Sequence, residues 1–131
     1  MPQSATRQRI FLAPAPRAVA DILDSDDLAH LRALGDLIVH EAGPVTDEQF
    51  NAIAGDTAII IGQIDLPESR LKKAPCLRAV FNVEGNFLPN VEYVYCFRNG
   101  IRVLGIGPVF AEPVAEAALG MAIDLARGIT R

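Results

Sequence analysis

The residues best suited to binding a ligand follow two predicted strands. Segment 82–87, Asn-Val-Glu-Gly-Asn-Phe, ends one apolar run, and Gly62-Gln63 ends an earlier one. In open α/β sheets ligands bind at the carboxyl edge of the strands. A glycine there lets backbone N–H groups approach an anion closely, and successive N–H groups of such a turn suit a carboxylate. Plain connecting turns fit the same spacing. The candidate substrate-binding residues are Glu84, Gly85, Asn86, Gly62 and Gln63.

Other reactive side chains form no complete catalytic or metal-binding set. His30 and His40 have no Cys, Asp or Glu three or four residues further on, where a second metal ligand would stand. Cys76 and Cys96 lie far apart and lack a positioned base. Gly105-Ile106-Gly107 begins like a dinucleotide-binding turn, but Phe110 stands where the third glycine is required. We therefore expect no catalytic residue, no metal site and no nucleotide site in this chain.

Composition indicates one globular domain. The chain has 131 residues, half of them hydrophobic, and 12 basic against 16 acidic residues give a net charge of −4. Scattered basic residues in an acidic chain argue against nucleic acid as a partner. No targeting segment is evident, and the apolar stretch 117–123 is far shorter than the roughly 20 residues that span a bilayer. Two unpaired cysteines suit a reducing compartment, so we expect a cytoplasmic protein with no membrane partner.

Short apolar runs alternate with helical patterns along the chain. Such βα alternation predicts an α/β fold, here a flavodoxin-like five-stranded parallel sheet with helices on both faces. The run Thr57–Gly62 has no polar alternation, so it is expected at the centre of the sheet. The predicted strands are 9–12, 36–40, 57–62, 78–83 and 101–105.

Capping residues predict where the helices begin and end. Thr46 and Gln49 form a capping box, and Gly55 ends that helix. Residues 24–27 are expected to cap a helix that Gly35 ends. Residues 67–69 open a short helix through residue 73, and Asn90 is the expected N-cap of a helix over 91–98.

The last helix is long and hydrophobic. Pro113 suits its first position, Gly128 suits its end, and apolar residues lie nearly all the way round between them. One sheet can cover only one side of such a helix. We therefore expect a second domain, a dimer partner or both to cover the rest. The chain stops at Arg131, directly after this helix, as a segment of a longer protein would.

Segment 77–127 resembles the D-isomer-specific 2-hydroxyacid dehydrogenase family. The resemblance is carried by the strand that leads into Asn-Val-Glu-Gly at 82–85, by Asn-Val-Glu at 90–92, by Asn-Gly-Ile-Arg-Val at 99–103, and by Pro-Val-Ala-Glu at 113–116 opening a helix that ends in Leu-Ala-Arg.

This resemblance implies a two-lobed enzyme that interconverts a D-2-hydroxy acid and a 2-keto acid with NAD or NADP. Residues 1–108 would be its flavodoxin-like substrate-binding domain. Residues 109–131 would be the helix that leads into a nucleotide-binding domain absent from this chain. Backbone amides around Glu84, Gly85 and Asn86 would hold the substrate carboxylate, and the helix would contribute to a homodimer. The catalytic residues belong to the absent domain, so the chain alone is expected to be inactive.

A second interpretation also fits the residues. A free-standing flavodoxin-like module, which regulates or dimerises without catalysis, would bury the same helix symmetrically. The end at Arg131 favours the first interpretation.

Overall fold

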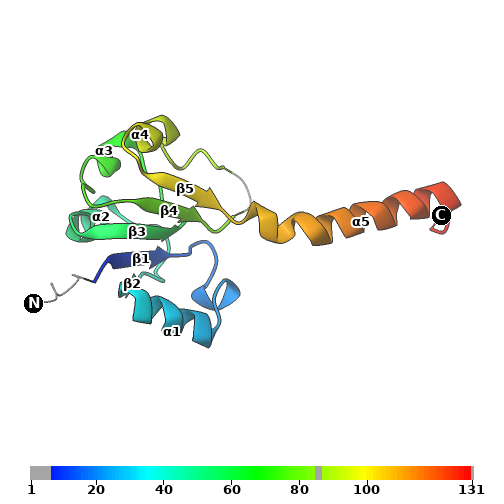
Figure 1. Cartoon of the computed structure of the whole chain (residues 1–131), viewed down its shortest axis with the longest axis horizontal. Coiled ribbons are helices and arrows are strands. Elements are labelled where there is room, and N and C mark those ends of the chain that lie inside the picture. Colours follow the sequence, from blue (N-terminus) through cyan, green and yellow to red (C-terminus); the bar gives the residue numbers. More distant parts are fainter. Residues whose placement is uncertain (1–6, 85–86, 131) are drawn as a thin grey trace, which may run out of the picture.

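The fold is a five-stranded parallel sheet in the order β2-β1-β3-β4-β5 (Figure 1). A computed structural model describes residues 7–84 and 87–130. This strand order is the flavodoxin-like one. The chain adds β2 on one side of β1 and then returns to add β3 on its other side, so the order of addition reverses between β1 and β3. The prediction of five parallel strands is confirmed, and β3 is central as its unbroken apolar run indicates. The strands are β1 (Arg9–Ala13), β2 (Asp36–Val39), β3 (Thr57–Gly62), β4 (Ala79–Asn82) and β5 (Arg102–Gly105).

Helices fill the connections between the strands. A 3-10 turn, η1 (Val19–Asp21), precedes α1 in the first connection and was not predicted. The last helix, α5, follows β5 and is by far the longest. The helices are α1 (Ser25–Leu34), α2 (Asp47–Ala54), α3 (Glu68–Leu71), α4 (Tyr93–Arg98) and α5 (Gly107–Arg127).

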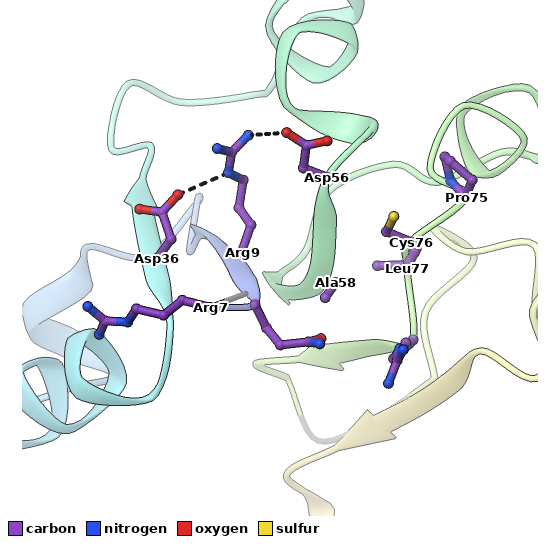
Figure 2. A pocket seen from close by; sticks show the side chains of 10 residues that line it. Arg7, Arg9, Asp36, Asp56, Ala58, Pro75, Cys76 and Leu77 are labelled. Carbon is purple, nitrogen blue, oxygen red and sulfur yellow. Dashed lines mark hydrogen bonds and ion pairs between the residues drawn. The ribbon is translucent and has the colours of Figure 1, made fainter. Parts of the chain in front are cut away.

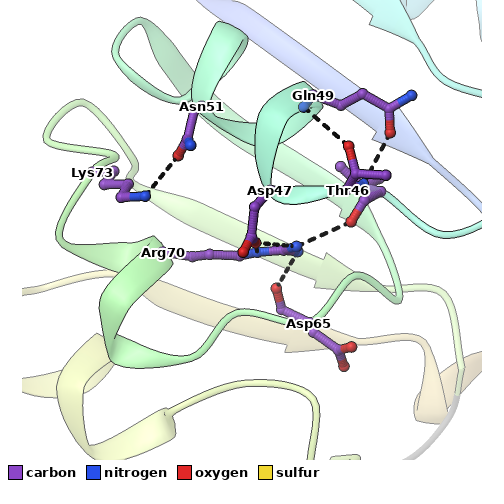
Figure 3. Close-up of polar contacts among 8 residues, drawn as sticks. Thr46, Asp47, Gln49, Asn51, Asp65, Arg70 and Lys73 are labelled. Atoms are coloured by element: carbon purple, nitrogen blue, oxygen red, sulfur yellow. Dashed lines mark hydrogen bonds and ion pairs between the residues drawn. The ribbon is translucent and has the colours of Figure 1, made fainter.

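The predicted helix caps of α1 and α2 are confirmed. Thr46 accepts a hydrogen bond from the Gln49 N–H at 3.2 Å, and the Gln49 side chain accepts from the Thr46 N–H at 2.9 Å (Figure 3). The Asp24 carboxylate accepts from the N–H groups of residues 26 and 27, which opens α1. These bonds satisfy amides that have no partner within the helix. Local sequence therefore determines both helix starts.

Two predicted helix starts are wrong. Helix α4 begins at Tyr93, and Asn90 does not cap it, because the backbone of residues 90–92 pairs with Leu66 in a parallel bridge. Helix α5 begins at Gly107, so Pro113 lies inside it and Pro108 takes the first-turn position. Proline suits the first turn of a helix, where its missing N–H costs nothing. Pro108 and Pro113, five residues apart, both suit a first turn by sequence, and the earlier one occupies it.

The main cluster of buried side chains lies on one face of the sheet. Alternate residues of neighbouring strands, Phe11, Ile60 and Val80, are at most 3% exposed. Side chains of α2, α3 and α4 cover them, and these helices contribute the buried Phe50, Leu71 and Cys96. The period of two along each strand sends the intervening residues to the other face.

Helix α5 leaves the carboxyl edge of the sheet and points away from the rest of the chain (Figure 1). Its 21 residues include none that is buried. Within the described residues, no helix is long and apolar enough to cross a membrane. The long C-terminal helix is thus confirmed, and its apolar side chains are left uncovered in a single copy of the chain.

Candidate functional site

Three central strands end at the same edge of the sheet, and their ends form the candidate site. Ala13 at the end of β1 pairs with Gly62 at the end of β3, and Ile61 pairs with Phe81 of β4. The pairing places Gly62-Gln63 beside residues 82–84, as the sequence predicts. Gly85 and Asn86, the other two candidate residues, lie outside the described residues. This edge is also the point where the strand order reverses, the usual ligand site of such sheets.

Gly62 is required by the close approach of two strands. Its φ is +145°, and a Cβ built on it would lie 1.9 Å from the Ala13 carbonyl oxygen. Residues other than glycine rarely adopt this backbone conformation. The structure therefore assigns Gly62 a packing role at the centre of the candidate edge.

Glu84 is held by an arginine from a distant part of the chain. The Arg17 guanidinium donates to both Glu84 carboxylate oxygens, at 2.7 and 3.2 Å. Arg17 stands in the loop after β1, so this bidentate pair joins the ends of β1 and β4. The pair leaves little unbalanced charge at the edge. Sequence reasoning missed Arg17, because nothing in its neighbourhood marks an arginine 67 residues away as a partner.

The Arg17 hydrogen bond lowers the pKa of Glu84 from its ordinary value, and burial opposes this in part. Because the folded pKa is depressed, the stabilisation from this pair is complete above the ordinary carboxyl pKa. It is lost as the pH falls through the folded pKa. We expect the substitution Arg17→Met to raise the pKa of Glu84, measured by NMR titration of its carboxyl carbon. Arg102→Met, at the start of β5, is the control and should leave that pKa unchanged.

The side-chain amides of Gln63, Asn82 and Asn90 have buried atoms at the same edge of the sheet. Asn82, the last residue of β4, is fully buried, and its Oδ1 accepts from Asn90 Nδ2 at 3.4 Å. Among the described residues, Asn82 Nδ2, Asn90 Oδ1 and both amide atoms of Gln63 have no hydrogen-bond partner. Unpaired buried amides are costly, so such atoms are normally satisfied by a water or a ligand.

Asn90 ties together the loops that follow β3 and β4. Its side chain donates to the Ile64 carbonyl oxygen, and its own carbonyl oxygen accepts from the Leu66 N–H at 2.6 Å. The Leu66 carbonyl oxygen in turn accepts from the Glu92 N–H at 3.0 Å. These bonds form a short parallel bridge outside the main sheet. The loop that carries the candidate carboxylate-binding residues is therefore anchored at its far end.

An apolar groove of about 760 Å³ opens beside this edge and extends over the sheet face opposite the core. Its floor is formed by β1, β3 and β4, and its walls come from η1, α1 and the first turn of α5. Arg17 and Asn82 line it on the polar side. The groove thus extends from the candidate edge to the first turn of α5.

A second cavity, of about 600 Å³, lies at the opposite edge of the sheet (Figure 2). Arg9 lies between Asp36 and Asp56 there, with 3.1 Å to a carboxylate oxygen of each. Cys76 is exposed at its rim. This is the edge where the strands begin, and the ion pairs neutralise its central arginine. We therefore assign it a structural role.

The remaining reactive residues form no group with the candidate residues. His40 follows β2 at the same edge of the sheet, where its N–H donates to the Leu12 carbonyl oxygen at 2.8 Å and its Nε2 lies 3.2 Å from the Gly43 carbonyl oxygen. His30 is exposed on α1. Burial raises the pKa of the Cys96 thiol, which makes it less reactive. Within residues 7–84 and 87–130 no group of His, Cys, Asp and Glu side chains could hold a metal ion.

The strand order and the ligand edge define a flavodoxin-like α/β domain. A phosphoglycerate oxidoreductase from Rhizobium etli superimposes with a TM-score of 0.77, at 38% sequence identity over 95% of this chain and 38% of that one. With this identity and the motifs at 82–85, 90–92 and 113–116, the chain belongs to the D-isomer-specific 2-hydroxyacid dehydrogenase family.

More distant structures share the fold. The protein PH0520 from Pyrococcus horikoshii matches with a TM-score of 0.69 at 20% identity, over 94% of this chain and 34% of that one. An NADPH-dependent glyoxylate/hydroxypyruvate reductase from Sinorhizobium meliloti, solved with NADP and malonate, matches with a TM-score of 0.59 at 22% identity, over 90% of this chain and 34% of that one. The chain thus spans little more than a third of these proteins. No family model and no curated protein sequence matches it.

Proposed function

We propose that this chain is the substrate-binding lobe of an NAD(P)-dependent oxidoreductase that interconverts a D-2-hydroxy acid and a 2-keto acid. The observation that carries the proposal is the 38% identity to the Rhizobium etli oxidoreductase, spread over 95% of this chain but only 38% of that protein. Residues 1–108 form the flavodoxin-like substrate-binding domain. Residues 109–131 belong to the helix that leads into a nucleotide-binding domain outside this chain, and that helix begins at Gly107.

The substrate carboxylate is proposed to bind the backbone N–H groups around Glu84, Gly85 and Asn86, beside Gly62 and Gln63. Because Arg17 is paired with Glu84, backbone amides rather than a free cation would carry this recognition. The lobe would position the substrate and exclude water when the two domains close on it. The enzyme is proposed to act in the cytoplasm, where exposed thiols such as Cys76 stay reduced.

The described residues do not fit a nicotinamide dinucleotide. Gly107 opens α5 and Ile106 stands at its N-cap without a side-chain cap, while Phe110 takes the place of the third glycine. The cofactor would therefore be held by the second domain. Relatives of the same fold use either form: the Sinorhizobium meliloti reductase was solved with NADP, and a D-lactate dehydrogenase from Aquifex aeolicus with NAD.

The intact mass of the natural gene product tests the domain assignment. The 131 residues weigh 14.1 kDa. A product of about twice this mass or more, as a second domain requires, agrees with the oxidoreductase. A native 14.1 kDa product would contradict catalysis and favour a free-standing module that dimerises.

Substitution of Gly85 tests the carboxylate site in that full-length protein. A Gly85→Leu side chain would stand where backbone amides must approach the anion, so we expect the KM for a 2-keto acid to rise at least about tenfold, the loss of about 1.4 kcal/mol of binding. Gly55→Leu is the matched control, since a Cβ at Gly55 meets nothing within 4 Å. Equal kinetic constants in the Gly85 variant and the wild type would show that the site lies elsewhere.

We also propose that the protein forms a homodimer through α5. Seven large apolar residues of this helix are exposed, which is far more than scattered surface residues of a monomer require. They are Val109, Phe110, Val114, Leu119, Met121, Ile123 and Leu125.

A further inference from the structure

Acidic side chains outnumber basic ones at the carboxyl edge of the sheet. Glu41 follows β2, Asp65 follows β3 and Glu84 follows β4. In the sequence that connects each strand to the next α-helix, Arg17 is the only lysine or arginine. Acidic groups repel an anion that approaches them, and the proposed substrate is an anion that binds at this edge. The state of this one arginine therefore has a large influence on which substrates the edge can take.

The loop after β1 holds Arg17 at this edge. The Arg17 N–H donates to the Pro14 carbonyl oxygen at 3.1 Å, which closes a turn. The Asp21 carboxylate accepts from the Ala18 N–H at 2.8 Å, so the backbone on the other side of Arg17 is also fixed. Arg17 lines the apolar groove together with Asn82. Two local hydrogen bonds thus place the arginine where its side chain reaches the end of β4.

The bonds to Glu84 use only part of the Arg17 guanidinium. Its Nε donates to Oε1 at 2.7 Å and its Nη2 donates to Oε2 at 3.2 Å, so Nη1 lies outside the pair. The hydrogen bond raises the pKa of Arg17 and lowers the pKa of Glu84, so both groups stay charged at neutral pH. The pair is therefore close to neutral as a unit. If Glu84 lost its charge, the positive charge of Arg17 would act on a bound substrate instead.

We propose that Arg17 determines the charge of the substrate that this lobe accepts. While Arg17 balances Glu84, the adjacent backbone N–H groups can bind one carboxylate without repulsion from that side chain. Because the Arg17 charge is used in this balance, the lobe supplies no net positive charge for a second anionic group. The inference rests on the proposed function and adds a substrate class to it. That class is 2-keto acids with a single negative charge, in preference to dicarboxylic or phosphorylated ones.

Two 2-keto acids of similar length test this preference in the full-length enzyme. The first is 2-ketovalerate, which carries one negative charge, and the second is oxaloacetate, which carries two. An unbalanced like charge at a binding site discriminates against the wrong ligand, so we expect the wild-type kcat/KM to be at least about tenfold higher for 2-ketovalerate. The ratio of the two kcat/KM values is the quantity to follow in the variants.

The substitution Glu84→Gln removes the negative charge of the pair and keeps an oxygen that accepts from Arg17. The Arg17 charge is then available to the second carboxylate of oxaloacetate. We expect the preference for 2-ketovalerate over oxaloacetate to fall at least about tenfold. A loss of loop structure alone would weaken both substrates alike and leave their ratio unchanged.

The substitution Arg17→Met has the opposite effect, because it leaves the Glu84 charge unbalanced. We expect the KM for 2-ketovalerate to rise about tenfold, with a smaller change in kcat. The double variant Arg17→Met/Glu84→Gln has neither charge and should return this KM to within about threefold of the wild type. A structural role for the pair predicts no such recovery. Arg102→Met, an exposed arginine at the start of β5 on the opposite edge, is the matched control.

The outcomes separate this inference from the proposed function. A full-length protein that reduces no 2-keto acid with NADH or NADPH overturns both. A wild type that reduces 2-keto acids without preferring 2-ketovalerate to oxaloacetate overturns this inference alone. The same holds if the ratio is equal in the wild type and Glu84→Gln, or if the KM of the double variant stays as high as that of Arg17→Met.

Discussion

Replacing Gly62 by alanine is expected to lower the free energy of unfolding by at least about 3 kcal/mol, measured by urea denaturation. The added Cβ would lie 1.9 Å from the Ala13 carbonyl oxygen and 2.7 Å from its carbon. Both atoms belong to the backbone of β1, so no side chain can move aside. The strain of a φ of +145° adds to this clash.

Gly55→Ala is the control for this substitution. Gly55 has φ −58°, which any residue adopts, and its Cβ would meet nothing within 4 Å. Its stability should change by no more than about 1 kcal/mol. A Gly62→Ala protein as stable as the Gly55→Ala protein would show that β1 and β3 can separate at this edge. Because Gly62 holds the strands together, a loss of substrate binding in its variants is not by itself a sign of direct contact.

The substitution Arg70→Met is expected to cost about 2 to 3 kcal/mol of stability. The Arg70 side chain is 13% exposed and donates to the carbonyl oxygens of Val45 and Asp65, at 3.0 Å each, as well as to Asp47 (Figure 3). Its guanidinium also lies 5.4 Å from the centre of the Phe50 ring. Methionine keeps the apolar volume but leaves the buried Val45 carbonyl oxygen without this donor.

Two further variants isolate the contribution of the planar guanidinium group. Arg70→Lys retains the charge but not the arrangement of donors that reaches both loops, so it should recover less than half of the lost stability. Lys73→Met removes an exposed side chain with a single bond to Asn51, at 2.9 Å, and should change stability by no more than about 0.5 kcal/mol. If Arg70→Met is as stable as Lys73→Met, the hydrogen bonds from Arg70 to the two loops do not contribute to the free energy of unfolding.

Helix boundaries show where local sequence is sufficient. Asp24 and the Thr46–Gln49 pair act on amides two or three residues away, so their roles follow from spacing alone. Asn90 has the same chemistry, but the residues after it pair with the distant Leu66, whose carbonyl oxygen accepts from the Glu92 N–H, so no helix begins there. A capping residue is predictable only when no distant segment pairs with the backbone that it would cap.

The candidate site also contains some residues whose positions follow from local sequence and others whose positions do not. Gly62-Gln63 and Glu84 were predictable, because parallel strands end together and glycine with polar residues marks those ends. The Arg17–Glu84 pair was not, since two loops 67 residues apart meet only after β1, β3 and β4 have paired. The burial of Asn82 also depends on packing, because nothing in the sequence of β4 marks its last residue as buried.

Sequence alone determined the flavodoxin-like class of fold, the central position of β3, the family and the long final helix, since each rests on periodicity or motifs within short segments. Only the tertiary structure decided the direction of α5, the open sheet face and the groove at the helix root. Helical periodicity records which side chains share a side of a helix. It does not record the direction in which the helix leaves the sheet, because that direction depends on where β5 ends in the folded sheet.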